Sequence, residues 1–373
     1  MTLETIPTPR VLIDRSRLEH NIAAMQTRAR EAGVRLRPHA KTHKSATVAR
    51  LQVDAGAVGI CCAKLGEAEV LAAAGIDDIR LPYPLQPANS GRVVALIERL
   101  RRLSIIVDDV GVARGWSEAM QRAGRRLDVL VKVDVGFHRC GVDPHAATTI
   151  DHIRTIAALP GLRFCGLLSH AGQAYAAETP FALEAIAREE IRLLTMLKDR
   201  LEASGLTVDE VSVGSTPTAR FIGDQPGVTE MRPGNYVFFD RTQVGLGAAS
   251  WETCAMTVLA SVVSRPAPNR VVFDAGSKTL TSDGVRGFTP TSGHGAVFRA
   301  GATAPDGSIQ IERLSEEHAV ARVPPDCDLR IGDRVRIVPN HACVVTNLAE
   351  DLLFVRGEAI EGEIRVDARG RNR

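Results

Sequence analysis

The first two thirds of the chain alternate between short apolar segments and stretches with the apolar spacing of a helix. The first such helix is expected to follow Asp14, which is placed to cap its N-terminus. Strands that alternate with helices build a parallel sheet, and eight such units make a closed (β/α)8 or TIM barrel. An open, doubly wound sheet is the alternative, but no Gly-x-Gly-x-x-Gly turn follows the first segment. The eight segments are Val34–Leu36, Val58–Cys62, Ile79–Leu81, Leu103–Val107, Val129–Val133, Phe164–Leu168, Val211–Val213 and Tyr236–Phe239.

The pattern changes after about residue 245, where strand-like segments follow one another with turn signals such as Asp283-Gly284 between them. We therefore expect an α/β protein with a barrel over residues 8–244 and a mostly antiparallel β domain over residues 245–373. Residues 1–7 are a candidate to pack with the second domain. The strands expected there are Met256–Val263, Arg270–Phe273, His318–Val323, Arg334–Val338 and Leu352–Val355.

Composition argues against two classes of partner. The 373 residues carry a net charge of +2, so the chain offers no broad basic field for nucleic acid. No apolar run is long enough to span a bilayer, and the N-terminal residues lack the basic flank and apolar core of a secretion signal. Seven cysteines form no regular framework, which fits a reducing compartment. We expect a cytoplasmic protein with neither a nucleic acid nor a membrane as partner.

Lys41 is the strongest catalytic candidate. It stands in Pro38-His39-Ala40-Lys41-Thr42-His43-Lys44, just where the first barrel strand would end. A lysine fixed there by a proline suits a Schiff base, because burial in a polar pocket lowers the pKa of an amine that must attack a carbonyl. The alternative is an ordinary basic loop. Lys44 and Lys64 are rival Schiff-base lysines that rank below Lys41.

Other polar residues follow the expected strands, at the end of the barrel where active sites of this fold lie. These side chains lie together at one open end of the barrel only if the barrel prediction is right. The set comprises Lys41, Cys62, Lys64, Tyr83, Asp108, Asp109, Asp134, Arg139, His170, Gln173, Ser215 and Thr216.

A phosphate-binding loop is expected after the seventh strand, at Gly214-Ser215-Thr216-Pro217-Thr218. Glycine lets the backbone approach an anion, and the hydroxyl and N–H groups can hold phosphate. A Ser/Thr helix cap is the alternative for Ser215 and Thr216. Tyr236 is a candidate second phosphate contact. A lysine after strand one and a phosphate loop after strand seven together suggest pyridoxal 5′-phosphate, held across the barrel mouth.

His341 and Cys343 form a candidate metal pair. If the segment is extended, residues i and i+2 point to one face, so the imidazole and the thiolate can meet one ion. Such a pair favours Zn²⁺ over Mg²⁺ and leaves coordination positions open for water or substrate. A core position or a chance pairing is the alternative. Nearby Glu350 and Asp351 are interpreted as turn residues.

Five motifs, in this order, resemble the D-serine dehydratase/D-threonine aldolase family of fold-type III, alanine-racemase-like enzymes. They are the Lys41 motif, Val133-Asp134-Val135-Gly136 through Arg139-Cys140-Gly141-Val142, the Gly214–Thr218 loop, Arg232-Pro233-Gly234-Asn235-Tyr236 and His341-Ala342-Cys343. The resemblance spans nearly the whole chain. It implies an alanine-racemase-type barrel with a C-terminal β domain, pyridoxal phosphate on Lys41, a divalent metal at His341 and Cys343, and a homodimer.

The resemblance implies a lyase of D-β-hydroxy amino acids with two possible reactions. Elimination from D-serine gives a keto acid and ammonia, whereas retro-aldol cleavage of D-threonine gives glycine and an aldehyde. Low-specificity aldolases of the family typically carry a Gln-His pair after the sixth strand and a histidine–aspartate metal pair. This chain has Ser169-His170 and Cys343 instead, which favours a zinc-dependent dehydratase. The aldolase stays the alternative, as do Mn²⁺ or Mg²⁺ for the metal; a racemase or a non-catalytic cofactor carrier is less favoured.

The resemblance also suggests roles for three further residues. Arg139 is expected to contact the cofactor's phenolic oxygen or a substrate carboxylate, with a surface ion pair as the alternative. Tyr175 is expected at the pyridine ring, with simple packing as the alternative. His170 is a candidate catalytic proton relay near the metal, although a barrel histidine with its hydrogen bonds satisfied is an equal alternative.

Overall fold

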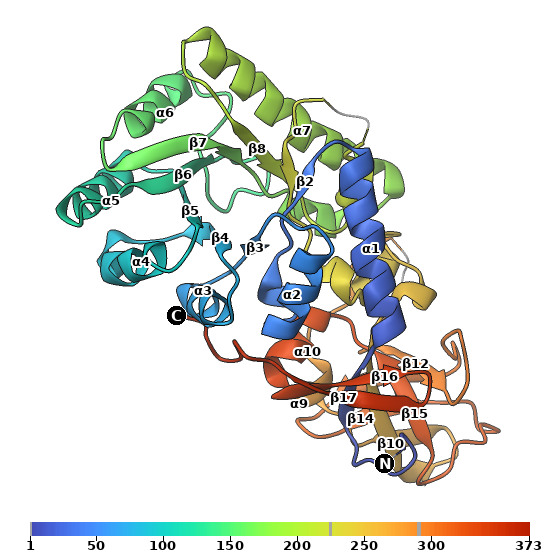
Figure 1. The fold of residues 1–373 in the computed structure, drawn as a ribbon. Helices are drawn as coiled ribbons and strands as arrows, with labels where there is room; N and C mark the ends of the chain where they lie inside the picture. The colour runs from blue at the N-terminus through green and yellow to red at the C-terminus, as the bar shows by residue number, and fades with distance from the viewer. Residues whose placement is uncertain (1, 224–225, 289–291) are drawn as a thin grey trace.

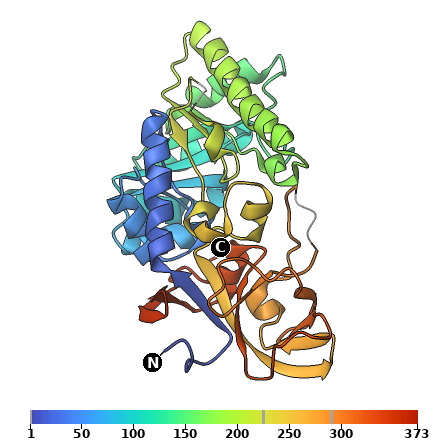
Figure 2. The same cartoon turned by 90° about the vertical axis from the view of Figure 1, so that its right-hand side faces the viewer.

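The computed structural model describes residues 2–223, 226–288 and 292–373 of the chain. Two parts are stacked along the long axis of the molecule (Figure 1). The first is a parallel sheet surrounded by helices, and the second is built on a mainly antiparallel sheet. A quarter turn shows the same two layers, with helix α1 (Arg15–Glu31) running along one side of the parallel sheet (Figure 2).

Eight parallel strands form the first sheet, in the order β2-β9-β8-β7-β6-β5-β4-β3. The two end strands approach each other, because a parallel bridge joins His39 to Cys61 and the Cys61 N–H donates to the Pro38 carbonyl at 2.7 Å. The predicted (β/α)8 barrel is therefore confirmed. The strands are β2 (Arg35–Leu36), β3 (Ile60–Cys61), β4 (Asp78–Pro84), β5 (Arg102–Val107), β6 (Leu127–Lys132), β7 (Leu162–Leu168), β8 (Glu210–Val213) and β9 (Glu230–Met231).

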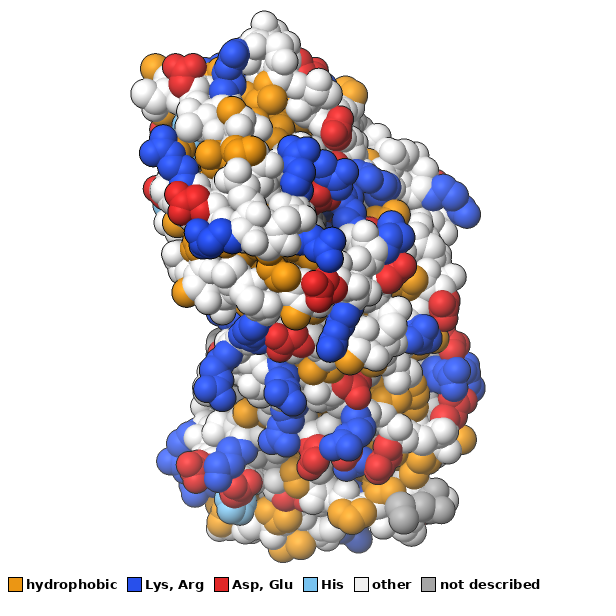
Figure 3. Space-filling view, turned by 60° about the vertical axis from the view of Figure 1, so that its left-hand side comes forward, with side chains coloured by type: hydrophobic (Ala, Val, Ile, Leu, Met, Phe, Trp, Pro, Cys, Tyr) orange, Lys and Arg blue, Asp and Glu red, His pale blue; other side chains and the backbone are white. Residues whose placement is uncertain are grey.

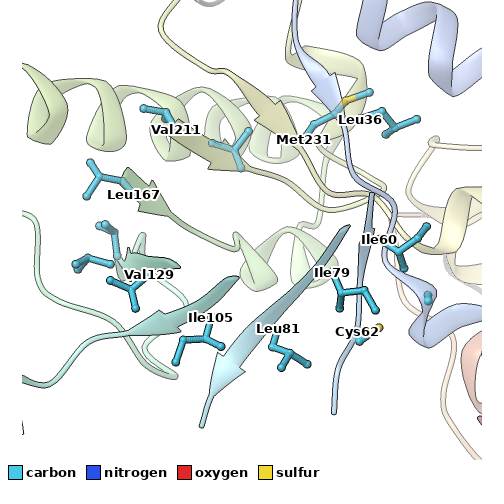
Figure 4. Close-up of a cluster of buried hydrophobic side chains, with 14 of the residues drawn as sticks. Leu36, Ile60, Cys62, Ile79, Leu81, Ile105, Val129, Leu167, Val211 and Met231 are labelled. Carbon is cyan, nitrogen blue, oxygen red and sulfur yellow. The ribbon is translucent and has the colours of Figure 1, made fainter. Parts of the chain in front are cut away.

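Helices cover the outer face of this sheet. Asp14 caps α1 as predicted, by accepting a hydrogen bond from the Arg17 N–H at 3.0 Å. Apolar side chains from all eight strands point outward to meet the helices (Figure 4), and each fully buried Leu, Ile or Val contributes about 1.5–3 kcal/mol. The remaining helices are α2 (Ala46–Asp54), α3 (Leu65–Ala73), α4 (Ser90–Ile97), α5 (Val110–Arg122), α6 (Thr149–Ala157), α7 (Pro180–Ala203) and α8 (Arg241–Gly245).

The prediction for the eighth strand was wrong. That strand is Glu230–Met231, and the predicted segment Tyr236–Phe239 instead begins with the 3-10 turn η5 (Asn235–Val237). Its apolar residues are buried because η5 packs against α1, at the junction with the second sheet. The true strand was not predicted because it contains Glu230, and a carboxylate is rarely buried without a partner.

The second sheet has nine strands and includes the N-terminal segment. Strand β1 (Arg10–Asp14) pairs antiparallel with β10 (Met256–Ala267) and parallel with β16 (Asp351–Arg356). Leu3 and Ile6 also pack on this sheet. The boundary at residues 244 and 245 remains a prediction. The other strands are β11 (Arg270–Phe273), β12 (Ala296–Arg299), β13 (Gln310–Leu314), β14 (Ala319–Arg322), β15 (Arg334–Val338) and β17 (Ala359–Arg365), and two helices, α9 (Ser277–Leu280) and α10 (Ala342–Leu348), accompany them.

Basic and acidic side chains are interspersed over both parts on the face that Figure 3 shows. In the described part of the chain, every helix is too short or too polar to cross a bilayer.

The inside of the barrel is charged at the end opposite the strand C-termini. Because successive side chains of a strand point to opposite faces, the neighbours of the outward apolar residues point inward. Arg80 donates to Glu230 and, at 2.6 Å, to Glu210, while Arg37 donates to Glu230 at 2.8 Å. Burial alone would raise the pKa of Glu230, but the attraction of Arg80 and Arg37 lowers it.

Replacing Arg80 by methionine should lower the free energy of unfolding by about 3–5 kcal/mol at neutral pH, because two buried carboxylates each lose one of the arginines that neutralise them. The folded-state pKa of Glu230 lies below its unfolded value of about 4.3, so its contribution is complete above that pH and is lost as the pH falls. Urea unfolding at several pH values measures both effects, and the loss caused by Arg80→Met should shrink in acid.

The matched control is Arg192→Met, which removes an exposed arginine paired with Glu189 at 2.6 Å. Exposed pairs contribute up to about 1 kcal/mol, so this variant should unfold almost like the wild type. An equal loss in both variants, or a loss in Arg80→Met that does not change with pH, would contradict a buried charge network.

Candidate active site

A cavity of about 260 Å³ lies where the C-terminal ends of the barrel strands meet the second part of the molecule. Nine predicted site residues line it: Lys41, Arg139, His170, Tyr175, Gly214, Ser215, Thr216, His341 and Cys343. Tyr236 does not, because its buried side chain points elsewhere and its hydroxyl accepts a hydrogen bond from Gln52 at 2.9 Å. Of the ten residues predicted to act in catalysis or to bind the cofactor or the metal, the structure therefore gathers nine, and Tyr236 is the exception.

Lys41 lies in the 3-10 turn η1 (Ala40–Thr42), which follows β2. His39 caps this turn, since its Nδ1 accepts the Lys41 N–H at 3.3 Å, and the Lys41 side chain is exposed to the cavity. Of the described lysines, Lys41 alone lines the cavity. Lys44 is buried and donates to Asn347 at 2.7 Å, and Lys64 lies over the Tyr83 ring at 4.9 Å. Geometry thus favours Lys41 over both rivals.

His170 stands at the end of β7 (Leu162–Leu168) as a neutral imidazole. Burial is the largest cause that lowers its pKa well below the ordinary value, and the positive charges of Lys41, Lys132 and Arg139 add to the effect. Its Nδ1 lies 3.5 Å from the Gly214 carbonyl, which can only accept, so Nδ1 carries the proton. Nε2 is then left with a lone pair and can accept a proton.

The loop after β8, Gly214–Thr218, turns tightly at the cavity. Gly214 has a φ of +106°, a conformation that L side chains rarely adopt, so the loop turns tightly there. Thr216 Oγ1 accepts from the N–H groups of Gly234 at 3.3 Å and Tyr236 at 3.2 Å, which draws the loops after β8 and β9 together. Within the described chain the Thr216 N–H itself has no protein acceptor. This loop fits a phosphate group.

Glu190 on α7 holds the ends of β7 and β8 in place. Its Oε1 accepts from the Ser169 hydroxyl at 2.6 Å and from the N–H groups of Ala171 at 3.2 Å and Gly214 at 3.3 Å. One buried carboxylate thereby fixes the segment that carries His170 and the start of the phosphate loop.

His341 and Cys343 meet at the start of helix α10. The argument for a metal pair assumed an extended segment, but only His341 is extended, as the N-cap, and Cys343 lies in the first helical turn. Thr42 Oγ1 lies 3.2 Å from the Cys343 sulfur, so η1 and α10 are in contact. Asp283 Oδ2 lies 2.7 Å from His341 Nδ1, an arrangement that leaves Nε2 as the coordinating atom and is common around metal-binding histidines.

Opposite charges stabilise this pair. Burial by itself would lower the pKa of His341, but the adjacent Cys343 sulfur, Asp240 and Asp283 raise it to about 10. The same contact with His341 lowers the pKa of Cys343, against the effect of burial. A thiolate and an imidazole with a carboxylate behind it fit a zinc-like ion. Among the described residues, no third His, Cys, Asp or Glu completes the set.

Several cavity residues had no signal in the sequence. Asp283 was interpreted as part of a turn, yet it orients His341. Asp240 precedes α8 as a cap and also accepts the Ala342 N–H at 2.9 Å, so it fixes the start of α10. Arg286 lies three residues beyond Asp283 and also lines the cavity. The role of a polar loop residue can be recognised only from the residues that contact it in the folded structure.

Other strand-end residues do not line the cavity. Asp109 caps α5, and Asp134 accepts the N–H groups of Gly136 and His138, each at 3.0 Å. Asp351, interpreted as a turn residue, forms an ion pair with Arg10 at 2.5 Å. The strand-end residues outside the lining are Cys62, Lys64, Tyr83, Asp108, Asp109, Asp134 and Gln173.

Comparison with known proteins shows which family shares this architecture. The family described as "Alanine racemase, N-terminal domain" matches residues 13–242, and "Putative serine dehydratase domain" matches residues 255–355. D-threo-3-hydroxyaspartate dehydratase of Delftia sp. is 37% identical over 92% of each chain. Its solved structure superposes with a TM-score of 0.91 over 98% of both chains, at 34% identity.

Two further relatives carry other activities in their names. D-threonine aldolase of Arthrobacter sp. is 33% identical and covers 100% of this chain and 95% of its own. D-serine dehydratase of Dictyostelium discoideum is 30% identical over 95% of each. The chain therefore belongs to the D-serine dehydratase/D-threonine aldolase family of alanine-racemase-like, pyridoxal-phosphate-dependent lyases.

Proposed function

We propose that this enzyme cleaves D-β-hydroxy amino acids with pyridoxal phosphate and a divalent metal, Zn²⁺ being favoured over Mn²⁺ and Mg²⁺. One observation carries the proposal: a single cavity joins the Lys41 amine, an anion-binding loop and the His341–Cys343 pair. The reaction that we favour is β-elimination of the dehydratase type. We also infer, from the family resemblance, that the enzyme works as a homodimer.

The cavity residues fit both pyridoxal phosphate and a divalent metal. Lys41 would hold the cofactor's aldehyde, and Gly214, Ser215 and Thr216 would hold its phosphate. When bound, the cofactor supplies an electron-accepting ring that stabilises negative charge at Cα, and the metal supplies a Lewis acid for the β-oxygen. Arg139 lines the same cavity, over the Phe137 ring at 5.2 Å, and can bind a carboxylate or the cofactor's phenolic oxygen.

In the elimination, the Lys41 amine would be free once the substrate's amino group has replaced it on the cofactor. It would then take the proton from Cα, and the electron pair of that bond would form the Cα–Cβ double bond. The Cβ–O bond breaks, and the departing oxygen gains a proton and leaves as water. Loss of ammonia after hydrolysis then gives the keto acid. His170 is neutral and has a free Nε2, so it can move a proton within the cavity.

Retro-aldol cleavage is the second candidate, and the aldolase relative, which covers the whole chain, supports it. In that reaction the β-hydroxyl loses its proton and the Cα–Cβ bond breaks, giving glycine and an aldehyde. Two of the three relatives named above are dehydratases, and this, together with the His-x-Cys pair, favours elimination. Elimination needs a base at Cα and retro-aldol cleavage needs a base at the β-hydroxyl. A cation at the β-oxygen assists both, so one cavity can serve either reaction.

The test is a product assay with holoenzyme on the D- and L-forms of serine and threonine. Pyruvate and ammonia from D-serine alone, with no reaction of L-serine, are the expected result. Glycine and acetaldehyde as the main products from D-threonine would replace elimination by aldol cleavage. Loss of optical activity without lyase products would contradict the proposal and indicate a racemase.

A further inference from the structure

Arg286 places a positive charge in the cavity that the reaction described above does not use. It belongs to the segment after α9 in the second part of the molecule, and its side chain is largely exposed. Its backbone is anchored, because the Arg286 N–H donates to Thr242 Oγ1 at 3.4 Å and the Phe288 N–H donates to the Gly245 carbonyl at 3.0 Å. The side chain is therefore held at the cavity by a fixed main chain.

Several other charged groups of the cavity already have partners. Asp283 pairs with His341, and Asp240 accepts from Asn235 at 2.5 Å. Arg232 is buried and donates to Ser212 at 2.5 Å. Within residues 2–223, 226–288 and 292–373, the Arg286 guanidinium forms neither an ion pair nor a hydrogen bond.

The guanidinium groups of Arg139 and Arg286 lie in different parts of the cavity. Arg139 lies over the Phe137 ring, whose centroid is 6.1 Å from that of His170 at the end of a barrel strand. The Arg286 N–H donates to Thr242 Oγ1, and this hydroxyl donates at 2.8 Å to the carbonyl of Asn340, the residue before His341. Arg286 thus stands at the end of the cavity that holds the His341–Cys343 pair.

The position of Arg286 determines which part of a bound substrate it can contact. A D-β-hydroxy amino acid that directs its β-oxygen toward His341 and Cys343 brings the other substituent of Cβ to the same end. A hydrogen or a methyl group there would leave the guanidinium unpaired. A carboxylate would match its planar donor pair with two parallel hydrogen bonds.

We propose that Arg286 is a specificity-determining residue that binds a carboxylate on Cβ, so the preferred substrates are D-β-hydroxy amino acids with a second acid group. The inference rests on the proposed function, because it assumes that the β-oxygen faces the metal pair.

The test compares kcat/KM for 3-hydroxy-D-aspartate and for D-threonine in the wild type and in Arg286→Gln. The wild type should prefer the diacid. Loss of a charge-assisted contact should lower kcat/KM for the diacid by about 10- to 100-fold and change that for D-threonine by less than about threefold. Arg286→Lys should recover part of the loss, since it keeps the charge without the planar donor pair. Added salt should weaken the diacid reaction more than the D-threonine reaction.

The D-threonine rate of each preparation reports correct folding, and Arg313→Gln, at an exposed arginine outside the cavity, is the matched control. A wild-type preference for D-threonine, or equal losses on both substrates in Arg286→Gln, would overturn the role of Arg286 and leave the lyase function standing. Absence of lyase activity on every D-β-hydroxy amino acid would overturn the proposed function itself.

Discussion

Lys41→Ala should remove covalent cofactor binding and lower kcat by at least about 1,000-fold, because one amine both holds the cofactor and takes the Cα proton. Lys41 is the lysine that lines the cavity in the described chain, together with His170 and the loop that begins at Gly214. The visible absorption of the purified variant measures cofactor attachment, and initial rates of keto acid formation measure activity. Added primary amines should restore part of the rate, since they can replace the missing base.

Lys64→Ala is the matched control, since Lys64 lies outside the cavity over the Tyr83 ring. It should keep the cofactor band and nearly the full rate. A Lys41→Ala variant with an unchanged band and rate would mean that another amine performs both tasks, and the placement of the cofactor would be wrong.

The second large effect is expected at the metal pair. Cys343→Ala and His341→Ala should each lose the bound metal and lower kcat by at least about 100-fold, because a Lewis acid contributes several kcal/mol to breaking a bond at the β-carbon. Cofactor attachment should persist, since Lys41 and the phosphate loop are intact. Metal content of the purified variants and the rate in added zinc measure the two effects.

Asp283→Asn provides a graded comparison. It keeps both coordinating atoms and weakens the group that orients His341, so metal affinity should fall by about 10- to 100-fold, with the rate restored by excess metal. The alanine variants should not be restored in this way. Full activity of a wild-type sample stripped of metal by a chelator would contradict the role given to this pair.

Local sequence patterns predicted much of the secondary structure of this protein correctly. Strand β11 (Arg270–Phe273) and strand β15 (Arg334–Val338) have the predicted bounds, because each is a short β-branched run between turns. The motifs at Lys41, Gly214 and His341 were predicted from their own residues, and the fold brings them to one cavity. The sequence was enough to predict these functional residues because each residue type is unusual at its position.

The rest required the tertiary structure. Strand β9 escaped prediction because Glu230 is stabilised inside the barrel by Arg80 and Arg37, which are distant in sequence. The orienting role of Asp283 depends on a contact with His341 that spans 58 positions. Arg286 resembles any surface arginine until the cavity is seen around it. No periodicity in the sequence marks such contacts.

The most direct test of the central claim is to reduce the holoenzyme with borohydride, which fixes the cofactor to the amine that holds it, and to map the modified peptide by mass spectrometry. The rival amine is Lys132, because burial, together with the charge of Arg232, lowers its pKa to about 8. We predict that the added mass appears on Lys41 alone. Label on Lys132, Lys44 or Lys64, or no label on a cofactor-saturated enzyme, would contradict the account.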